Sequence, residues 1–222
     1  MRILSFVLAV VFPLLPAMAQ VPPNAMEQAD YSGLHRAALD GYVSTIRRLA
    51  AEGADLEARD GKGRTPVHVA AFASNDEALV ALAEAGADMN ALEGQAYDAV
   101  TIAAVADDPE MMTLAIELGN DPGLVTSPYD GTALIAAAHL GHDEVVRRLI
   151  AAGAPLDHVN NLGWTALIEA VVLGDGGPRH QRVVRALVDA GADQALADRQ
   201  GRTPLDLAVS RGYSAIAEIL RD

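Results

Sequence analysis

The chain has 222 residues and a formal net charge of -14, from 16 basic and 30 acidic side chains. A charge this negative argues against binding to nucleic-acid phosphates, which requires clustered Lys and Arg. The absence of cysteine excludes a disulfide framework, a thiolate metal site and a cysteine nucleophile. Because the chain is 51% hydrophobic but has only 3 Phe, 5 Tyr and 1 Trp, we expect a core of Ala, Leu, Val and Ile.

Residues 1–19 have the layout of a secretory signal peptide. Arg2 is their single charge, residues 3–15 form an apolar run, and residues 17–19 (Ala-Met-Ala) form a small-x-small cleavage site. The alternative is a membrane anchor, but the run is shorter than the roughly 20 residues that a helix needs to span a bilayer. We therefore expect cleavage after Ala19 and no membrane anchor in the mature form. If the source has two membranes, export would deliver the protein to the periplasm.

A unit of about 33 residues repeats along the rest of the chain. Glycine stops at Gly53, Gly86, Gly119, Gly153 and Gly191 follow one another at steps of 33, 33, 34 and 38 residues. A second landmark, the Thr-Pro or Thr-Ala start, keeps the same register, so the period indicates a repeat architecture. After a linker at 20–30, one domain over 31–222 is expected, with repeats at about 31–59, 60–92, 93–125, 126–159, 160–197 and 198–222.

Each repeat is predicted to contain two helices and a turn. Thr65 can cap a helix whose first position is Pro66, where no backbone N–H is needed. Residues 143–152 place apolar side chains on one helical face, and a glycine ends that helix. A polar stretch such as residues 60–63 (Asp-Gly-Lys-Gly) then makes a hairpin turn into the next repeat.

These motifs resemble the ankyrin repeat family. Residues 65–71 (Thr-Pro-Val-His-Val-Ala-Ala) match its start pattern, and residues 86–90 (Gly-Ala-Asp-Met-Asn) and 141–142 (Gly-His) match its other landmarks. The resemblance implies an all-α solenoid of about six helix–turn–helix units, joined by β-hairpin-like loops, with a concave groove. It also implies structural positions for the histidines and tyrosines at the two landmarks, namely His35, His68, His142, His180, Tyr42 and Tyr213.

Two repeats depart from the family pattern. The third lacks Thr-Pro and carries Asn120 where the family has alanine, and the fifth has five additional residues, 175–179, between its helices. The role of this insertion stays open.

Few side chains suggest chemistry. His139 and His158 lie outside the landmark positions, but neither has a carboxylate at metal-ligand spacing in the sequence. Glu169 replaces an apolar residue of a first helix, and we expect it to accept a hydrogen bond within its own repeat. The sequence has no phosphate-binding or nucleophile motif. It therefore predicts no enzyme, no cofactor and no metal.

The aromatic residues suggest a binding surface instead. Five of the seven that follow residue 19 fall in hairpins or at a first-helix end, which face the groove in the family, and Tyr and Trp often anchor protein interfaces. The alternative is that some of them pack between neighbouring hairpins. The predicted partner-binding residues are Tyr31, Arg64, Phe72, Tyr97, Tyr129, His139, Trp164 and Arg202.

We therefore expect a monomeric, non-catalytic protein–protein interaction module of the cell envelope, binding a partner protein through the concave groove. It would serve as an inhibitor, immunity or protective factor for an exported enzyme. The alternative is a periplasmic protein that binds a small molecule or a metal through the groove and the 175–179 loop.

Overall fold

The computed structural model describes residues 20–222, so the predicted signal peptide at 1–19 lies outside the described residues. The described chain is helical, and its one β-bridge joins Thr126 to Gly131. No helix within it is long and apolar enough to cross a membrane. Its helices are α1 (Ala25–Asp30), α2 (Gly33–Asp40), α3 (Val43–Ala51), α4 (Pro66–Phe72), α5 (Asp76–Glu84), α6 (Ala99–Val105), α7 (Pro109–Glu117), α8 (Ala133–Leu140), α9 (Asp143–Ala151), α10 (Ala166–Val172), α11 (Pro178–Asp189), α12 (Pro204–Arg211) and α13 (Ser214–Ile219).

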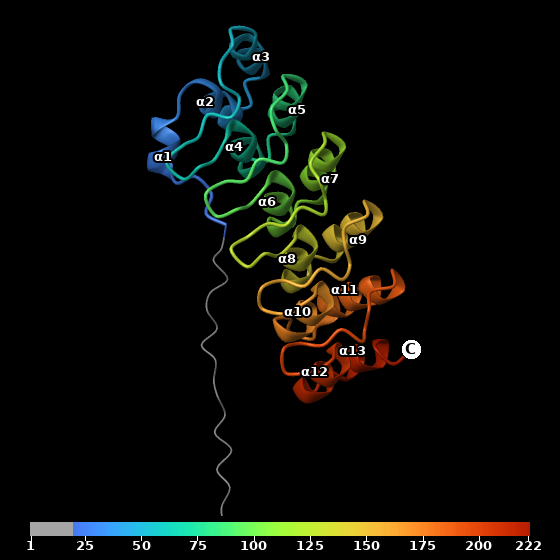
Figure 1. Ribbon diagram of the computed structural model, residues 1–222. Helices are drawn as coiled ribbons and strands as arrows, with labels where there is room; N and C mark the ends of the chain where they lie inside the picture. Colours follow the sequence, from blue (N-terminus) through green and yellow to red (C-terminus); the bar gives the residue numbers. More distant parts are fainter. Residues whose placement is uncertain (1–19) are drawn as a thin grey trace, which may run out of the picture.

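Six helix pairs stack into a two-layered solenoid, which confirms the predicted all-α repeat fold (Figure 1). The first helices of the pairs, α2, α4, α6, α8, α10 and α12, pack in one row, and the second helices pack in another. The turns that join successive pairs project from the side of the first helices (Figure 1). Helix α1 lies beside these turns at the N-terminal end.

The boundaries of the first helices follow from local sequence. The hydroxyls of Thr132, Thr165 and Thr203 accept hydrogen bonds from backbone N–H groups three residues later, which satisfies one donor at each helix start. Helices α8 and α12 end at Gly141 and Gly212, whose φ angles of 73° are left-handed and therefore favour glycine.

The core is built from small and aliphatic side chains, as the composition predicted. One alanine recurs at the same position of each first helix and is at most 1% exposed, which lets neighbouring helices approach closely. These alanines are Ala37, Ala70, Ala103, Ala137, Ala170 and Ala208. Leu79, Leu134, Leu149 and Leu187 fill the space between the rows.

The landmark histidines connect neighbouring repeats. The Nε2 atoms of His35 and His68 lie 2.9 and 3.0 Å from the carbonyl oxygens of Arg64 and Tyr97, in the next hairpin along the chain. A carbonyl can only accept, so Nε2 of His68 carries the proton, and Nδ1 accepts from the N–H of Thr65. Burial lowers the pKa of His68 to about 4, so this ring stays neutral. These bonds confirm the structural role that the resemblance implied.

The His or Tyr that follows a first helix hydrogen bonds to the preceding repeat. His142, His180 and Tyr213 hydrogen bond to the carbonyls of Ala104, His139 and Gly174. The structural role expected for Tyr42 is wrong. Tyr42 is 56% exposed, because within residues 20–222 no helix pair precedes its own and offers a carbonyl.

The interpretation of residues 20–30 as a linker is also wrong, because α1 occupies most of this segment. Asn24 accepts hydrogen bonds from the N–H groups of Met26 and Glu27, and the Glu27 carboxylate accepts one from the N–H of Asn24. This reciprocal capping box provides hydrogen-bond acceptors for backbone N–H groups at the start of α1. Without them these groups would have no partner within the helix, and so short a helix would be less stable.

The departures of the third repeat form one buried polar network. Asp98 replaces the capping threonine and accepts from the N–H of Thr101 at 2.8 Å. Asn120, 2% exposed, donates to Asp98 Oδ2 at 2.8 Å and accepts from the N–H of Val100 at 3.2 Å. Burial raises the pKa of Asp98. The buried carboxylate of Asp98 needs a hydrogen-bond donor, and Asn120 supplies it.

This network can be tested by restoring the family residues. Asn120→Ala should lower the free energy of unfolding by about 1–3 kcal/mol, because Asp98 Oδ2 would lose a buried donor. The double variant Asp98→Thr, Asn120→Ala should recover most of this loss. Urea unfolding followed by circular dichroism measures both effects, and additive losses in the double variant would contradict the coupling.

The insertion at 175–179 is bound to the rest of the solenoid. Arg179 follows Pro178, the first residue of α11, and reaches past the fourth repeat to Asp107 of the third, with the Nη2 and Oδ2 atoms 2.6 Å apart. Asp175 pairs with His180 at 2.8 Å. The insertion therefore lengthens α11 and ties the third repeat to the fifth.

Candidate protein-binding surface

The hairpin turns form a continuous edge along one side of the solenoid. Successive turns are joined by backbone hydrogen bonds, in which an N–H group of one turn donates to a carbonyl of the turn before it. Gly94 donates to Lys62, Ser127 to Ala96, and Asn161 to Tyr129, at 2.9, 2.7 and 2.9 Å. At the last step the Arg199 side chain takes over and donates to the carbonyl of Asn161 at 2.5 Å. The turns are therefore held in fixed positions relative to one another.

Two of the predicted contact residues lie in the interior, so the expectation that they face the groove is wrong. Arg64 is 1% exposed and Tyr97 is 6% exposed. Both occupy the position just before a helix-capping residue, where the side chain turns inwards against the neighbouring hairpin. For Tyr97 the alternative, packing between hairpins, is the one that the burial supports.

The other predicted contact residues reach the surface to different degrees. Arg202 is exposed, and its guanidinium pairs with Asp198 at 2.7 Å. The remaining five, all half-buried, are Tyr31, Phe72, Tyr129, His139 and Trp164. Phe72 and Trp164 also pack against the core, so only part of each ring is available to a partner.

Sequence reasoning missed the aliphatic part of this surface. Val159 and Leu162, in the turn that contains Asn161, are 48% and 38% exposed, and Leu140 at the end of α8 is 39% exposed. All three occupy the same hairpin and helix-end positions that identified the aromatic residues. Their positions in the repeat would have identified them if aliphatic residues had been considered alongside the aromatic ones.

His139 and Glu169 form a small polar cluster below this surface. The carboxylate of Glu169, 5% exposed, accepts from Asn160 Nδ2 at 2.7 Å and lies 3.5 Å from His139 Nδ1. The hydrogen bond from Asn160 confirms the intra-repeat bond that the sequence predicted for Glu169. His158 bonds to the carbonyl of Asp130 at 2.6 Å.

The alternative, a protein that binds a small molecule or a metal, was predicted to use the groove and the 175–179 loop. Within residues 20–222 no three His, Asp or Glu side chains are placed to hold a metal ion. The charged groups of the 175–179 loop are engaged with the protein itself, as described above.

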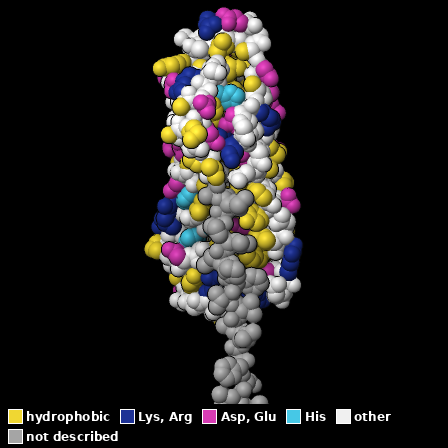
Figure 2. Space-filling model, turned by 90° about the vertical axis from the view of Figure 1, so that its left-hand side faces the viewer, with side chains coloured by type: hydrophobic (Ala, Val, Ile, Leu, Met, Phe, Trp, Pro, Cys, Tyr) yellow, Lys and Arg dark blue, Asp and Glu magenta, His cyan; other side chains and the backbone are white. Residues whose placement is uncertain are grey.

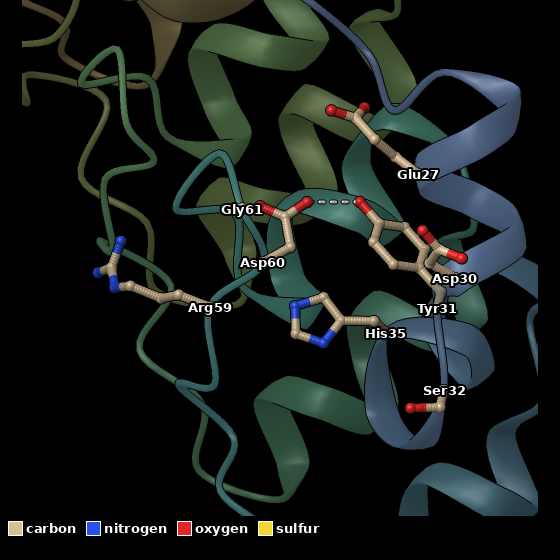
Figure 3. A pocket seen from close by; sticks show the side chains of 8 residues that line it. All are labelled: Glu27, Asp30, Tyr31, Ser32, His35, Arg59, Asp60 and Gly61. Atoms are coloured by element: carbon tan, nitrogen blue, oxygen red, sulfur yellow. Dashed lines mark hydrogen bonds between the residues drawn. The ribbon is translucent and has the colours of Figure 1, made fainter.

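Arg64 is the centre of an ion-pair cluster at the N-terminal end. Its guanidinium lies 2.7 Å from Asp60 and 2.8 Å from Glu27 of α1, and it donates to the carbonyl of Val21 at 3.2 Å. Tyr31 donates to Asp60 at 2.6 Å (Figure 3). Burial would raise the pKa of Asp60, but these hydrogen bonds prevail and lower it to about 2. The cluster thus fixes residues 21–31 against the first hairpin.

A hollow of about 390 Å³ lies beside this cluster, between α1 and the first hairpin (Figure 3). The residues that line it are Glu27, Asp30, Tyr31, Ser32, His35, Arg59, Asp60 and Gly61. Glu27, Asp60 and Tyr31 already have partners within the cluster, so these groups serve to attach α1.

We expect Arg64→Met to lower the free energy of unfolding by about 3 kcal/mol at pH 7, because two carboxylates lose a buried partner. The pKa of Asp60 is lowered from 3.8 to about 2 by folding, so its contribution is present above pH 4 and is lost as pH falls towards 2. The difference between wild type and variant should shrink over that range. Urea unfolding at several pH values measures it, with the exposed Lys62→Met as control. A difference independent of pH would contradict the assignment.

Comparison with known proteins extends over most of the chain. The family model "Ankyrin repeats (3 copies)" matches residues 7–93 and 100–196, and "Ankyrin repeats (many copies)" matches residues 178–221. The chain is 41% identical over 93 residues to YahD of Escherichia coli (strain K12), an ankyrin repeat protein by name, covering 41% of this chain and 46% of that protein. The chain thus spans less than half the length of this curated relative.

Solved structures show the same fold. An ankyrin repeat domain from Acinetobacter baumannii AYE superposes with a TM-score of 0.79 at 42% identity, covering 85% of this chain and 95% of that one. The ankyrin repeat protein EF0377 gives a TM-score of 0.78 at 31% identity, covering 86% and 98%. A complex of a predatory endopeptidase from Bdellovibrio bacteriovorus with an immunity protein gives 0.70 at 23% identity, covering 86% and 97%, and this likeness shows the fold alone.

Proposed function

The chain belongs to the ankyrin repeat family, whose repeats bind protein partners, and from this premise we propose that it is a non-catalytic interaction module. One partner protein would bind along the hairpin edge and the ends of the first helices. The observation that carries this proposal is the group of exposed aliphatic residues, Leu140, Val159 and Leu162, in the same hairpins and helix ends as Tyr129 and Trp164. Exposed apolar groups of this kind mark interaction sites when they gather on one face.

Two physical features support binding at this edge. Backbone hydrogen bonds between the turns fix the edge before a partner arrives, so little conformational entropy is lost on binding. Trp164 and Tyr129 are half-buried, which holds each ring in place while leaving part of its surface to contact a partner.

The proposal includes a location and a narrower role. The charge, apolar run and small-residue site of residues 1–19 support export to the cell envelope. There the module would act as an inhibitor, immunity or protective factor by covering a surface of an exported enzyme. A monomer suffices for this role.

Binding at the edge can be tested by affinity capture from a cell-envelope extract with the mature protein. The double variant Leu162→Ser, Trp164→Ala should reduce recovery of the captured partner at least about tenfold, because it removes central apolar contacts. Mass spectrometry of the bound fraction measures the recovery.

The matched control is Met26→Ser on α1, which also alters an exposed apolar residue but lies outside the hairpins and the first helices of the repeats. It should leave recovery unchanged. Thermal unfolding establishes that the double variant is folded. Equal recovery by the double variant and the control would contradict binding at the hairpin edge.

Export predicts a specific processing product. When the full-length chain is expressed with an intact secretion pathway, the mature protein should begin at Gln20, because signal peptidase cleaves after the small residue of the site. Intact-mass measurement of the envelope fraction identifies the terminus. Arg2→Glu should lower the exported fraction, and an unprocessed soluble chain beginning at Met1 would contradict the signal peptide.

A further inference from the structure

Glu169 is a buried carboxylate that the chain matches only in part. It replaces an apolar residue of α10 and is 5% exposed. Its Oε1 atom accepts a hydrogen bond from Asn160 Nδ2 at 2.7 Å, whereas its Oε2 atom lies 3.5 Å from Nδ1 of the half-buried His139. Within residues 20–222, no Lys or Arg lies at ion-pair distance from this carboxylate. A buried carboxylate is costly unless donors or cations match both of its oxygens, and Oε2 is the oxygen that lacks a strong partner.

Two other hairpins show how a carboxylate is matched at the corresponding place. Asp60 and Asp198 occupy the position of Asn160, because each accepts hydrogen bonds from two backbone N–H groups of its own turn, as Asn160 does. The second oxygen of each aspartate pairs with the arginine four residues later, Arg64 or Arg202, at 2.7 Å in both cases. Each of these hairpins therefore holds a carboxylate together with its own guanidinium.

The hairpin at 160–164 has the carboxylate without the arginine. Asn160 places an amide where the other two hairpins have aspartate, and Trp164 stands directly before the capping threonine, where they have arginine. The carboxylate comes instead from Glu169, which Asn160 joins to the turn. A charge that an arginine neutralises in two equivalent turns is therefore left with an amide and an imidazole ring. The site has an acceptor for a cation that residues 20–222 do not supply as Lys or Arg.

The charged groups around Glu169 do not replace this arginine. The arginines of α11, which packs against α10, pair with carboxylates of other elements. The two arginines of the next hairpin are occupied, one by a carboxylate and the other by a backbone carbonyl. On α12, Arg211 lies over the ring of Tyr213, and Asp206 is exposed, as is Asp130 in the preceding turn. The unpaired charges of this region thus favour a cation.

Apolar side chains adjoin both polar partners of Glu169. Trp164 belongs to the same turn as Asn160, and Leu140 follows His139 directly. Seen from the hairpin side, side chains of both charges are interspersed with hydrophobic ones in the part not covered by grey atoms (Figure 2). No field of one sign would attract a partner to this face, so recognition of a cation requires a specific acceptor. The face of a tryptophan ring also attracts cations, and apolar neighbours can cover the alkyl part of an arginine.

We propose that Glu169 receives the guanidinium of an arginine side chain that the partner protein inserts at this part of the edge. This inference rests on the proposed function and specifies the chemistry of the partner. The guanidinium would donate to Oε2 and supply the charge that Arg64 and Arg202 supply in their own hairpins. Its alkyl chain would lie against Trp164 and Leu162. The partner would therefore present an arginine flanked by apolar residues.

The direct test uses two fluorescent nine-residue peptides and the mature protein. Both peptides have leucines on either side of a central residue, which is arginine in one and citrulline, its uncharged isostere, in the other. Fluorescence anisotropy should show the arginine peptide binding at least about tenfold more tightly, because only its guanidinium forms an ion pair in a largely buried site. Equal binding of the two peptides, or no binding of the arginine peptide, would overturn the inference.

Glu169→Gln locates the contact, because glutamine keeps an oxygen for Asn160 and removes the charge. It should abolish the preference for the arginine peptide over the citrulline peptide. The matched control is Asp130→Asn, which removes an equal charge from an exposed carboxylate that is unpaired within residues 20–222, at a left-handed position that asparagine tolerates. It should keep the preference, because exposed charges contribute little. An unchanged preference in Glu169→Gln, or an equal loss in both variants, would contradict the assignment.

A second variant tests the site with Glu169 in place. Trp164→Arg gives the hairpin the arginine that its two counterparts have, so an internal guanidinium should occupy Glu169. The ratio of the two peptide affinities should then fall to about one, although the loss of the indole weakens both peptides. A ratio that stays as high as in the wild type would count against Glu169 as the acceptor. Thermal unfolding establishes that each variant is folded.

The result separates this inference from the proposed function. If capture of the natural partner depends on Leu162 and Trp164 but is unaffected by Glu169→Gln, the edge binds a protein and only the arginine inference fails. If capture is unaffected by either kind of variant, the proposed function fails as well.

Discussion

A pair of helices of this size cannot bury both of its apolar faces alone, so each pair depends on contact with the next. The recurring alanine of the first helices makes that contact close enough to exclude water. Side chains then add polar links in both directions. His68 reaches forward to the next hairpin, and His142 and Tyr213 reach back to the previous helix. Stability, rigidity and the positions of the hairpins all follow from this contact between neighbours.

The same dependence explains the two ends of the solenoid formed by residues 20–222, where the terminal helix pair contacts a neighbouring pair on one side. Within the described residues no helix pair before α2 and α3 offers a carbonyl to Tyr42, which is exposed. Helix α1 stabilises this end from another direction, through the buried ion pairs of Arg64 with Glu27 and Asp60. A buried arginine is stabilising only when its donors are matched, and residues 21–31 supply acceptors that the repeat itself lacks.

Departures from the repeat pattern also have local physical reasons. Asp98 and Asn120 are each unusual, yet together they satisfy the same helix start that a threonine satisfies elsewhere. The insertion at 175–179 places Arg179 where it can pair with a residue two repeats away. These compensations preserve the spacing of the hairpins, and with it the continuous edge to which we assign binding.

The sequence by itself determined the fold, because the landmarks that define a repeat act locally. A threonine caps its own helix, a glycine ends it, and the period of these residues fixes which faces meet. The sequence also placed Glu169 correctly within its own repeat. Only the tertiary structure decided which landmark residues are exposed. Arg64 and Tyr97 share with Trp164 the position before a cap, yet the first two are buried and Trp164 is half-exposed. The difference arises because the burial of each side chain depends on the elements that pack against its hairpin. One such element is α1 beside Arg64, which lies outside the repeats, so the repeat pattern does not reveal it.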